Sequence, residues 1–346
     1  MNSTRTVTII GGGLAGLTLG IALRHRGVPV VLFEADRYPR HRVCGEFISG
    51  RGRQTLTTLG LDPVLFESGA REAMTTRFFT RAIKGPIRPL PEAALCISRF
   101  VLDAVLAREF RRLGGELREG ERRVYHADSE GVVFATGRRP CPKAGRWRWF
   151  GIKAHARDIP LESDLEMHLV ANGYVGICRL SDDRVNVCGL FRRDDEAGAA
   201  SSRTAMLKGE PGSLLYQRLA SAEFLTETIR TVAGLDLRPS LGGDHSECRI
   251  GDALTMIPPF TGNGMSMAFE SAELACDPLA QWSCGTTDWK EARAQIANQC
   301  GYAFHRRLQW AGRIHALMFL GGLQPALMTW LPRFAAPWDF LYSRVR

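Results

Sequence analysis

The order of apolar and polar residues at the start of the chain is that of an α/β unit. The β-branched run over residues 7–10 is followed at once by the glycine-rich segment 11–16. Residues 17–26 then have helical character, which Gly27 ends, and a second apolar run covers 28–33. This order predicts a strand, a tight turn, a helix and a second strand.

The middle of the chain has a different period. Between residues 147 and 193, apolar and polar residues alternate, as in segment 164–169. The pair Asn172-Gly173 is typical of a tight hairpin turn, and 181–183 favours a second turn. The pattern therefore predicts an antiparallel meander of strands over this region.

Helices are expected on either side of that meander. Ser98 can cap a helix over 100–113, which Gly114-Gly115 would end, and another helix is expected over 265–280. The region 295–346 is helical and apolar in character. Glycine and proline interrupt its apolar run over 314–331, so we expect no membrane span there.

Composition and charge narrow the function classes. The chain has 346 residues, a formal net charge of +9 and nine cysteines, without any C-x-x-C pair. We therefore expect no disulfide framework and no metal site, and a reducing, cytoplasmic location. The scattered basic residues favour anionic partners such as acidic lipid headgroups or carrier proteins, but not nucleic acid.

The glycine-rich turn carries the first chemistry. Gly11, Gly13 and Gly16 form G-x-G-x-x-G directly after a predicted strand, and Glu34 ends the next strand. Such glycines let the backbone approach a pyrophosphate at a helix N-terminus, and the carboxylate can accept bonds from ribose hydroxyls. A carboxylate at this point disfavours a 2′-phosphate, so the nucleotide is expected to be FAD or NAD.

Two later motifs favour FAD. The run 131–138 is a buried strand that ends in small residues, as needed where backbone passes close to an adenosine group. Asp252 follows a third strand and could bond a ribitol chain. The amides of 262–265, at the start of a helix, would face the flavin pyrimidine edge, where reduced flavin is negatively charged.

With these motifs in this order, the chain resembles the flavoprotein superfamily of p-hydroxybenzoate hydroxylase, geranylgeranyl reductases and flavin-dependent halogenases. The matching segments are GGGLAG, RVCGEFIS, ISRFVLD, VVFATGRR and GDALTMIPPFTGNGMSMAFESA. The Cys-Gly-Glu loop and the P-F-T-G-N-G segment are most similar to the geranylgeranyl-reductase-like branch. The segment 147–152 resembles the halogenase W-x-W-x-I-P signature, but its Ile is one position late and no Pro follows it.

The resemblance implies an α/β fold in which a Rossmann-like, GR2-type FAD-binding domain is interleaved with an antiparallel β-sheet substrate domain. The FAD-binding domain would comprise 1–70, 96–140 and 240–290. The substrate domain would comprise 71–95 and 141–239, and 291–346 would form a C-terminal helical region.

Motifs and resemblance together give a set of candidate site residues. Cys44 and Glu46 are the catalytic candidates, and Lys153 and His155, two apart on one strand, are substrate candidates. The expected FAD contacts are Gly11, Gly13, Leu14, Ala15, Gly16, Glu34, Ala35, Arg42, Cys44, Gly45, Arg99, Ala135, Thr136, Gly137, Gly251, Asp252, Pro259, Gly262, Asn263, Gly264 and Met265.

Three functions follow from these expectations. The first is C=C reduction in an apolar, polyprenyl or polyketide-like small molecule, with NAD(P)H as the external electron donor. The second is monooxygenation of an aromatic or polyketide substrate in secondary metabolism. The third is flavin binding without turnover. We expect a monomer, cytoplasmic or peripheral to a membrane, that contacts a membrane surface or a carrier protein.

Overall fold

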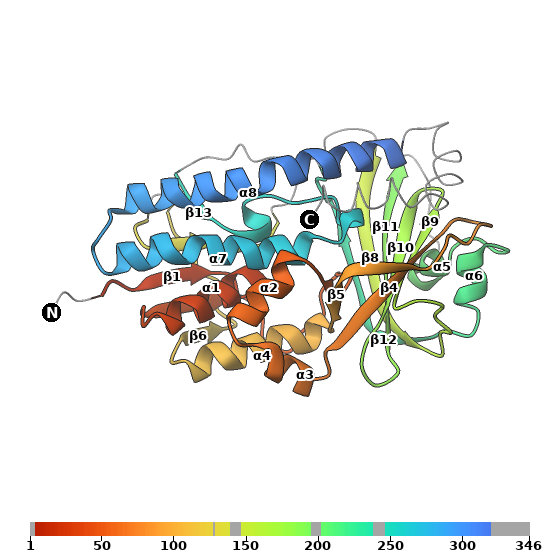
Figure 1. Ribbon diagram of the computed structural model, residues 1–346, viewed down its shortest axis with the longest axis horizontal. Coiled ribbons are helices and arrows are strands. Elements are labelled where there is room, and N and C mark those ends of the chain that lie inside the picture. The colour runs from red at the N-terminus through yellow and green to blue at the C-terminus, as the bar shows by residue number, and fades with distance from the viewer. Residues whose placement is uncertain (1–3, 127–128, 139–146, 195–201, 238–245, 320–346) are drawn as a thin grey trace.

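The structure is a computed structural model that describes residues 4–126, 129–138, 147–194, 202–237 and 246–319. The molecule is elongated, with a helix-covered parallel sheet at one end and a large antiparallel sheet at the other (Figure 1). The described strands form two sheets, one of five strands and one of eight.

The five-stranded sheet is parallel and has the order β13-β7-β1-β2-β6. Its strands are β1 (Val7–Ile10), β2 (Val30–Glu34), β6 (Glu116–Glu119), β7 (Val132–Phe134) and β13 (Cys248–Arg249). The carboxyl ends of β1, β7 and β13 lie side by side, which brings the three nucleotide motifs of the sequence to one edge.

The eight-stranded sheet has the order β12-β8-β11-β10-β9-β4-β5-β3. Its strands are β3 (Phe47–Ile48), β4 (Arg71–Phe79), β5 (Arg88–Cys96), β8 (Trp147–Arg157), β9 (Leu165–Val170), β10 (Gly173–Arg179), β11 (Val185–Asp194) and β12 (Glu223–Ala233). All neighbours are antiparallel except β4 and β9, which run parallel.

The helices are of unequal length and role. The long ones are α1 (Leu14–His25), α4 (Arg99–Arg112), α7 (Gly264–Ser283) and α8 (Trp289–Met318). The short ones are α2 (Arg51–Thr58), α3 (Asp62–Glu67), α5 (Arg203–Lys208) and α6 (Leu214–Arg218), with 3-10 turns at Gly251–Ala253 and Pro259–Thr261.

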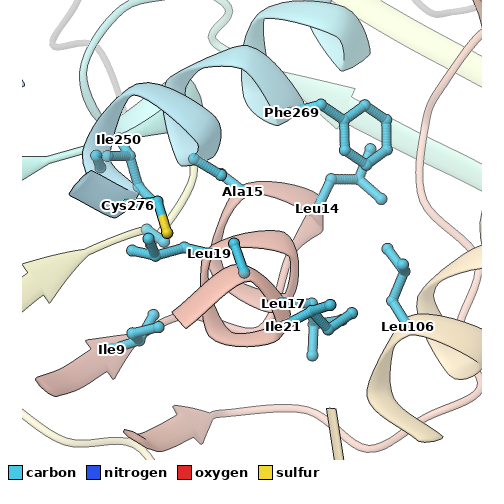
Figure 2. Close-up of a cluster of buried hydrophobic side chains, with 14 of the residues drawn as sticks. Ile9, Leu14, Ala15, Leu17, Leu19, Ile21, Leu106, Ile250, Phe269 and Cys276 are labelled. Carbon is cyan, nitrogen blue, oxygen red and sulfur yellow. The ribbon is translucent and has the colours of Figure 1, made fainter. Parts of the chain in front are cut away.

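Helix α1 is the centre of the larger core. Ten consecutive residues of α1, from position 14 to 23, are buried, because α7 and α4 cover the sides that the sheet leaves free. Figure 2 shows Leu14 beside Phe269 of α7 and Leu17 on the side of Leu106 of α4. A helix that is apolar on all sides is a core helix, and the N-terminus of this one carries the glycine-rich turn.

Helix α8 connects the two ends of the molecule. It runs along the top of the view in Figure 1, from above the parallel sheet to the antiparallel sheet, and Arg307 Nη1 binds Glu270 of α7 at 2.6 Å with both side chains buried. Near its end, the rings of His315 and Phe319 each lie 4.7 Å from the ring of Trp149 on β8. The second sheet therefore packs against the end of α8.

The predicted elements are present in the described residues, with shifted ends. Helix α1 begins at Leu14 rather than 17, and the meander is formed by β9, β10 and β11. Its first turn is Ala171-Asn172, one residue earlier than expected, because Gly173 is already paired in β10. A methyl group on Gly173 would lie 2.1 Å from the Leu190 carbonyl oxygen, so close strand pairing is what requires this glycine.

Both faces of the meander are buried. Glu166 and His168, on the face opposite to Leu165 and Leu169, are 2% and 1% exposed. The His168 ring stacks on Phe79 at 4.3 Å, and Glu166 accepts a hydrogen bond from Arg218 of α6 at 2.9 Å. The apolar residues of this alternation therefore pack on one face of the sheet, and the polar residues make buried polar and ring contacts on the other face instead of facing solvent.

The expectation about membranes concerns the last helix. In the part of the chain that the structure describes, no helix is both long and apolar enough to cross a membrane. Of the helical region expected over 295–346, α8 is described as far as Met318, and residues 320–346 lie outside the described ranges.

Removing the cap of α4 gives a modest test of this fold. Ser98 is the N-cap, and its hydroxyl accepts a hydrogen bond from the Val101 amide at 3.2 Å. Ser98→Ala should lower the free energy of unfolding by about 1 kcal/mol, measured by chemical denaturation. A free energy of unfolding equal to that of wild type in Ser98→Ala would contradict this role of the cap.

Candidate functional site

The turn between β1 and α1 is packed so tightly that only glycine fits at two positions. Gly11 has φ +109°, and a methyl group there would lie 2.3 Å from the Ala135 carbonyl oxygen. A methyl group on Gly16 would lie 2.0 Å from the Gly11 carbonyl oxygen. These contacts fix the β1–α1 turn against the end of β7.

Gly13 differs, because it faces open space. No atom lies within 4 Å of where its Cβ would be, and as N-cap of α1 it gives the helix no side-chain cap. The first amides of a helix have no partner within the helix, and they attract anions. A pyrophosphate therefore fits at the start of α1, where Leu14, Ala15 and Gly16 supply the first-turn amides.

Glu34 lies at the end of β2, beside this turn. Its carboxylate accepts hydrogen bonds from the Gly12 amide at 2.7 Å, the Asp36 amide at 2.8 Å and Arg40 Nη2 at 2.9 Å. Burial alone would raise the pKa of Glu34, but these donors and the Arg40 charge lower it. Arg40 Nη1 lies a further 2.8 Å from Glu34 Oε1, so protein nitrogens already surround the carboxylate, and its bond to a ribose hydroxyl stays a prediction.

Arg40 is a residue of this region that the sequence reasoning missed. Its guanidinium contacts Glu34 and lies 4.7 Å from the centre of the Tyr38 ring. The Tyr38 hydroxyl donates to the Gly12 carbonyl. The spacing of six residues between Glu34 and Arg40 does not indicate this contact, because only the conformation of the loop brings the two side chains together.

The predicted arginine contacts have protein partners. Arg42 is exposed and pairs with Asp36 at 3.0 Å. Arg99 binds Asp103 through two hydrogen bonds of 2.6 and 2.9 Å, and Asp103 is fully buried. Contact of either arginine with FAD stays a prediction.

Asp252 lies next to the end of β13 with its side chain accessible to solvent. Loss of hydration among the surrounding protein atoms nevertheless raises the pKa of its carboxyl, and the charges of Arg99 and Arg138 oppose this rise. An accessible carboxyl in such dense surroundings suits a ligand hydroxyl. Thr136 is also exposed, and Gly137 has φ +73°, so the end of β7 stays open as well.

The start of α7 packs on the Cys-Gly-Glu loop. Gly262 has φ +64°, and a methyl group there would lie 2.3 Å from the Phe47 ring. The Ser266 hydroxyl donates to the Ser49 carbonyl at 2.6 Å. Two motifs more than 200 positions apart are thus in contact, with Pro259 exposed and Gly264 and Met265 opening the helix.

Glu46 is the centre of a buried group of charges. It is 0% exposed and has φ +59°, which is unusual for a residue with a side chain. Its carboxylate contacts Lys153 Nζ at 2.9 Å and His155 Nε2 at 2.7 Å, and accepts from the Arg99 amide at 2.9 Å. Burial raises the pKa of Glu46, but these partners lower it overall, so Glu46 is a carboxylate at neutral pH.

Lys153 and His155 therefore meet Glu46 rather than solvent. Both are buried on β8, on the same face of the strand as the spacing predicted. Lys153 Nζ lies 3.3 Å from His41 Nδ1, and the His155 amide donates to the Thr228 hydroxyl at 2.8 Å. Burial and the Lys153 charge lower the pKa of His41 to about 4, so a neutral His41 accepts from Lys153.

Cys44 is held as a thiol in the same loop. Burial raises the pKa of Cys44, although Arg99 opposes this rise. The Glu46 amide donates to its sulfur at 3.4 Å, and the Asn186 side-chain amide donates to its carbonyl at 3.0 Å. A protonated thiol is a poor nucleophile, so the geometry favours a positioning role for this loop.

The groups gathered at this site are not those of a metal centre. Among the described residues, no group of three or more His, Cys, Asp or Glu side chains could hold a metal ion. The site instead combines the groups of a dinucleotide site with a buried acid–base cluster.

Comparisons with known proteins agree with this geometry. Residues 4–139 match a family model described as an FAD binding domain. The menaquinone reductase of Mycobacterium tuberculosis (strain ATCC 25618 / H37Rv) is 24% identical over 323 residues, which cover 81% of this chain and 77% of the relative.

Solved structures share the fold at low identity. The flavin-dependent brominase Bmp2 has a TM-score of 0.76 and 19% identity, and the match covers 99% of this chain and 93% of the brominase. The halogenase PltM, in complex with phloroglucinol and FAD, has a TM-score of 0.71 and 14% identity, with 91% of this chain and 76% of PltM covered. The predicted α/β fold, with a Rossmann-like sheet beside a separate antiparallel sheet, is confirmed.

Proposed function

We propose that this chain, an FAD-dependent oxidoreductase, reduces a C=C bond in an apolar, polyprenyl or polyketide-like small molecule. The observation that carries the proposal is the buried Lys153 on the Glu46 carboxylate, beside the loop that meets the start of α7. Similarity to a menaquinone reductase supports the reductase branch over the other functions that the fold accommodates.

The reaction needs a hydride and a proton. FAD held at this site would supply hydride transfer to one carbon of the double bond, with NAD(P)H as the external donor. The other carbon takes a proton, so that one C=C bond becomes a C–C bond and NAD(P)⁺ is released. The protein must therefore keep a proton donor near a dry, apolar substrate.

The described residues provide a route for that proton. His41 is partly exposed and contacts Lys153, which contacts Glu46, which contacts His155. His155 Nδ1 has no hydrogen-bond partner among the described residues, although it is buried. Glu46 keeps the cluster close to charge balance, because its carboxylate offsets a cation that would be costly to bury alone.

The surroundings of the reaction are part of the same proposal. An apolar substrate would reach the protein from a membrane surface or from a carrier protein, and the net charge of +9 favours contact with acidic forms of either. We propose a cytoplasmic monomer that binds such a surface peripherally.

Anaerobic turnover tests the proposal. Holoprotein reduced with NAD(P)H is mixed with prenylated quinones and polyketide alkenes, and products are identified by mass spectrometry. After any hydroquinone has been reoxidised, the expected product has gained two hydrogen atoms at a C=C bond and no oxygen. A product that has gained one oxygen atom in air would instead support monooxygenation, and reduced flavin that reacts with no candidate would support flavin binding without turnover.

A further inference from the structure

One face of the second sheet carries both the acid–base cluster and an apolar cluster. Directly paired residues of a sheet lie on the same face. In register, Lys153 of β8 pairs with Cys188 of β11, and Gly151 pairs with Leu190. Leu190 pairs in turn with Tyr174 of β10. Tyr174 is therefore on the face of Lys153, one pair of positions further along the sheet.

The apolar end of this face is covered by aromatic side chains. Tyr174 lies edge-on to Phe260 at 5.4 Å, and Trp149 contacts the rings of His315 and Phe319. Phe260 is two residues before Gly262, in the loop that opens α7. The apolar cluster thus lies between the flavin-side loop, the sheet and the end of α8.

Two polar atoms in this cluster are buried without a hydrogen bond. Tyr174 is only 4% exposed, and its hydroxyl has no hydrogen-bond partner among the described residues. His315 Nδ1 has none there either. Buried polar groups in folded proteins almost always have a partner, and an unpaired one costs stability. These two atoms therefore indicate a polar ligand group.

We propose that Tyr174 and His315 bind an oxygen of a ring-bearing substrate, a quinone carbonyl or phenol hydroxyl, while Trp149, Phe260 and Phe319 contact the ring. The inference rests on the proposed function, because it defines the substrate class of the same site. The chain attached to the ring would lie along the apolar face of the sheet.

The groups in the cluster suit a neutral ligand. Burial raises the pKa of Tyr174 well above its usual value, so the hydroxyl stays a donor. Burial and the nearby Arg192 lower the pKa of His315 to about 4, which keeps its ring neutral. Arg192 Nη1 donates to the Phe319 carbonyl at 3.1 Å, and its charge favours an electron-rich ring oxygen.

Binding to the oxidised holoprotein tests the inference without turnover. The flavin absorbance is titrated with a prenylated naphthoquinone and with a prenyl hydrocarbon of the same chain length, which has no oxygen. Tyr174→Phe should weaken quinone binding about tenfold and leave hydrocarbon binding unchanged, since only the ring oxygen loses a hydrogen bond. Tyr216→Phe, exposed on α6, is the matched control and should change neither.

His315→Leu provides a second variant, with the same expected selectivity, in case Tyr174→Phe retains no FAD. Equal quinone affinity in wild type and Tyr174→Phe, an equal loss for both ligands, or no quinone binding by wild type would each overturn the inference. If the quinone binds with the expected selectivity but is not reduced, the inference stands and the proposed function fails.

Discussion

Glu46→Gln is expected to lower the free energy of unfolding by about 3 kcal/mol, because it leaves a buried ammonium group without its counter-charge. Lys153 is 0% exposed and its nearest other partner is the neutral ring of His41. The same variant should lose most of its turnover, since Lys153 and His155 would no longer be held together. The measurements are chemical denaturation at a fixed FAD concentration and anaerobic C=C reduction in a prenylated quinone.

Two further variants separate charge balance from general damage. Glu46→Gln combined with Lys153→Met should recover part of the stability but not the turnover, because the uncompensated charge is gone. Glu210→Gln, which breaks the exposed pair with Arg81, should change stability little. If Glu46→Gln is as stable as wild type, the cluster is not the electrostatic unit described above.

The pH dependence follows from the lowered pKa of Glu46. A carboxyl whose folded pKa lies below its unfolded value, about 4.3, stabilises the fold at higher pH. That contribution is lost as the pH falls through the lower, folded pKa. Wild type should therefore lose stability on acidification below about pH 4 more steeply than Glu46→Gln.

Gly16→Ala should impair folding, whereas Gly13→Ala should impair FAD binding, although both glycines lie in one turn. In Gly16→Ala the methyl group would meet the Gly11 carbonyl oxygen at 2.0 Å, so we expect a loss of about 3 kcal/mol or more and little folded protein. In Gly13→Ala the methyl group meets no protein atom within 4 Å, and the fold should be intact. Its FAD affinity should fall about tenfold or more, since the methyl group occupies the approach to the pyrophosphate.

Flavin content, FAD titration of apoprotein and thermal unfolding distinguish these outcomes. Gly301→Ala is a control, because a methyl group on this helical glycine would also have no atom within 4 Å. It should gain about 1 kcal/mol from helix propensity and keep its FAD. Normal FAD affinity in Gly13→Ala would show that the dinucleotide does not pass over this turn.

Much of the fold could be predicted because its signals are local. The strand, glycine turn and helix at the start of the chain depend on neighbouring residues. The same holds for the predicted Ser98 cap, which is confirmed by the hydrogen bond from the Val101 amide to the Ser98 hydroxyl. The FAD motifs could also be recognised from neighbouring residues. Their meeting at one sheet edge follows from the general rule for parallel strands.

The chemistry of the site could be predicted only in part. The spacing of Lys153 and His155 correctly placed them on one face of a strand, but spacing does not say what a face meets. Glu46 stands more than 100 positions from both, and only the fold shows that its carboxylate lies between them. His41, Arg40 and Thr228 carried no motif, so only their contacts show that they belong to the site.

The sequence by itself determined the cofactor motifs, the α/β order of elements and the hairpin of the substrate sheet, since each depends on residues close together in the chain. Tertiary structure alone decided which charges are paired, that Gly13 is open while Gly16 is closed, and that Tyr174 shares a face with Lys153. These features depend on strand register and on burial between distant segments. Both are set by the packing of the whole molecule and not by any local pattern.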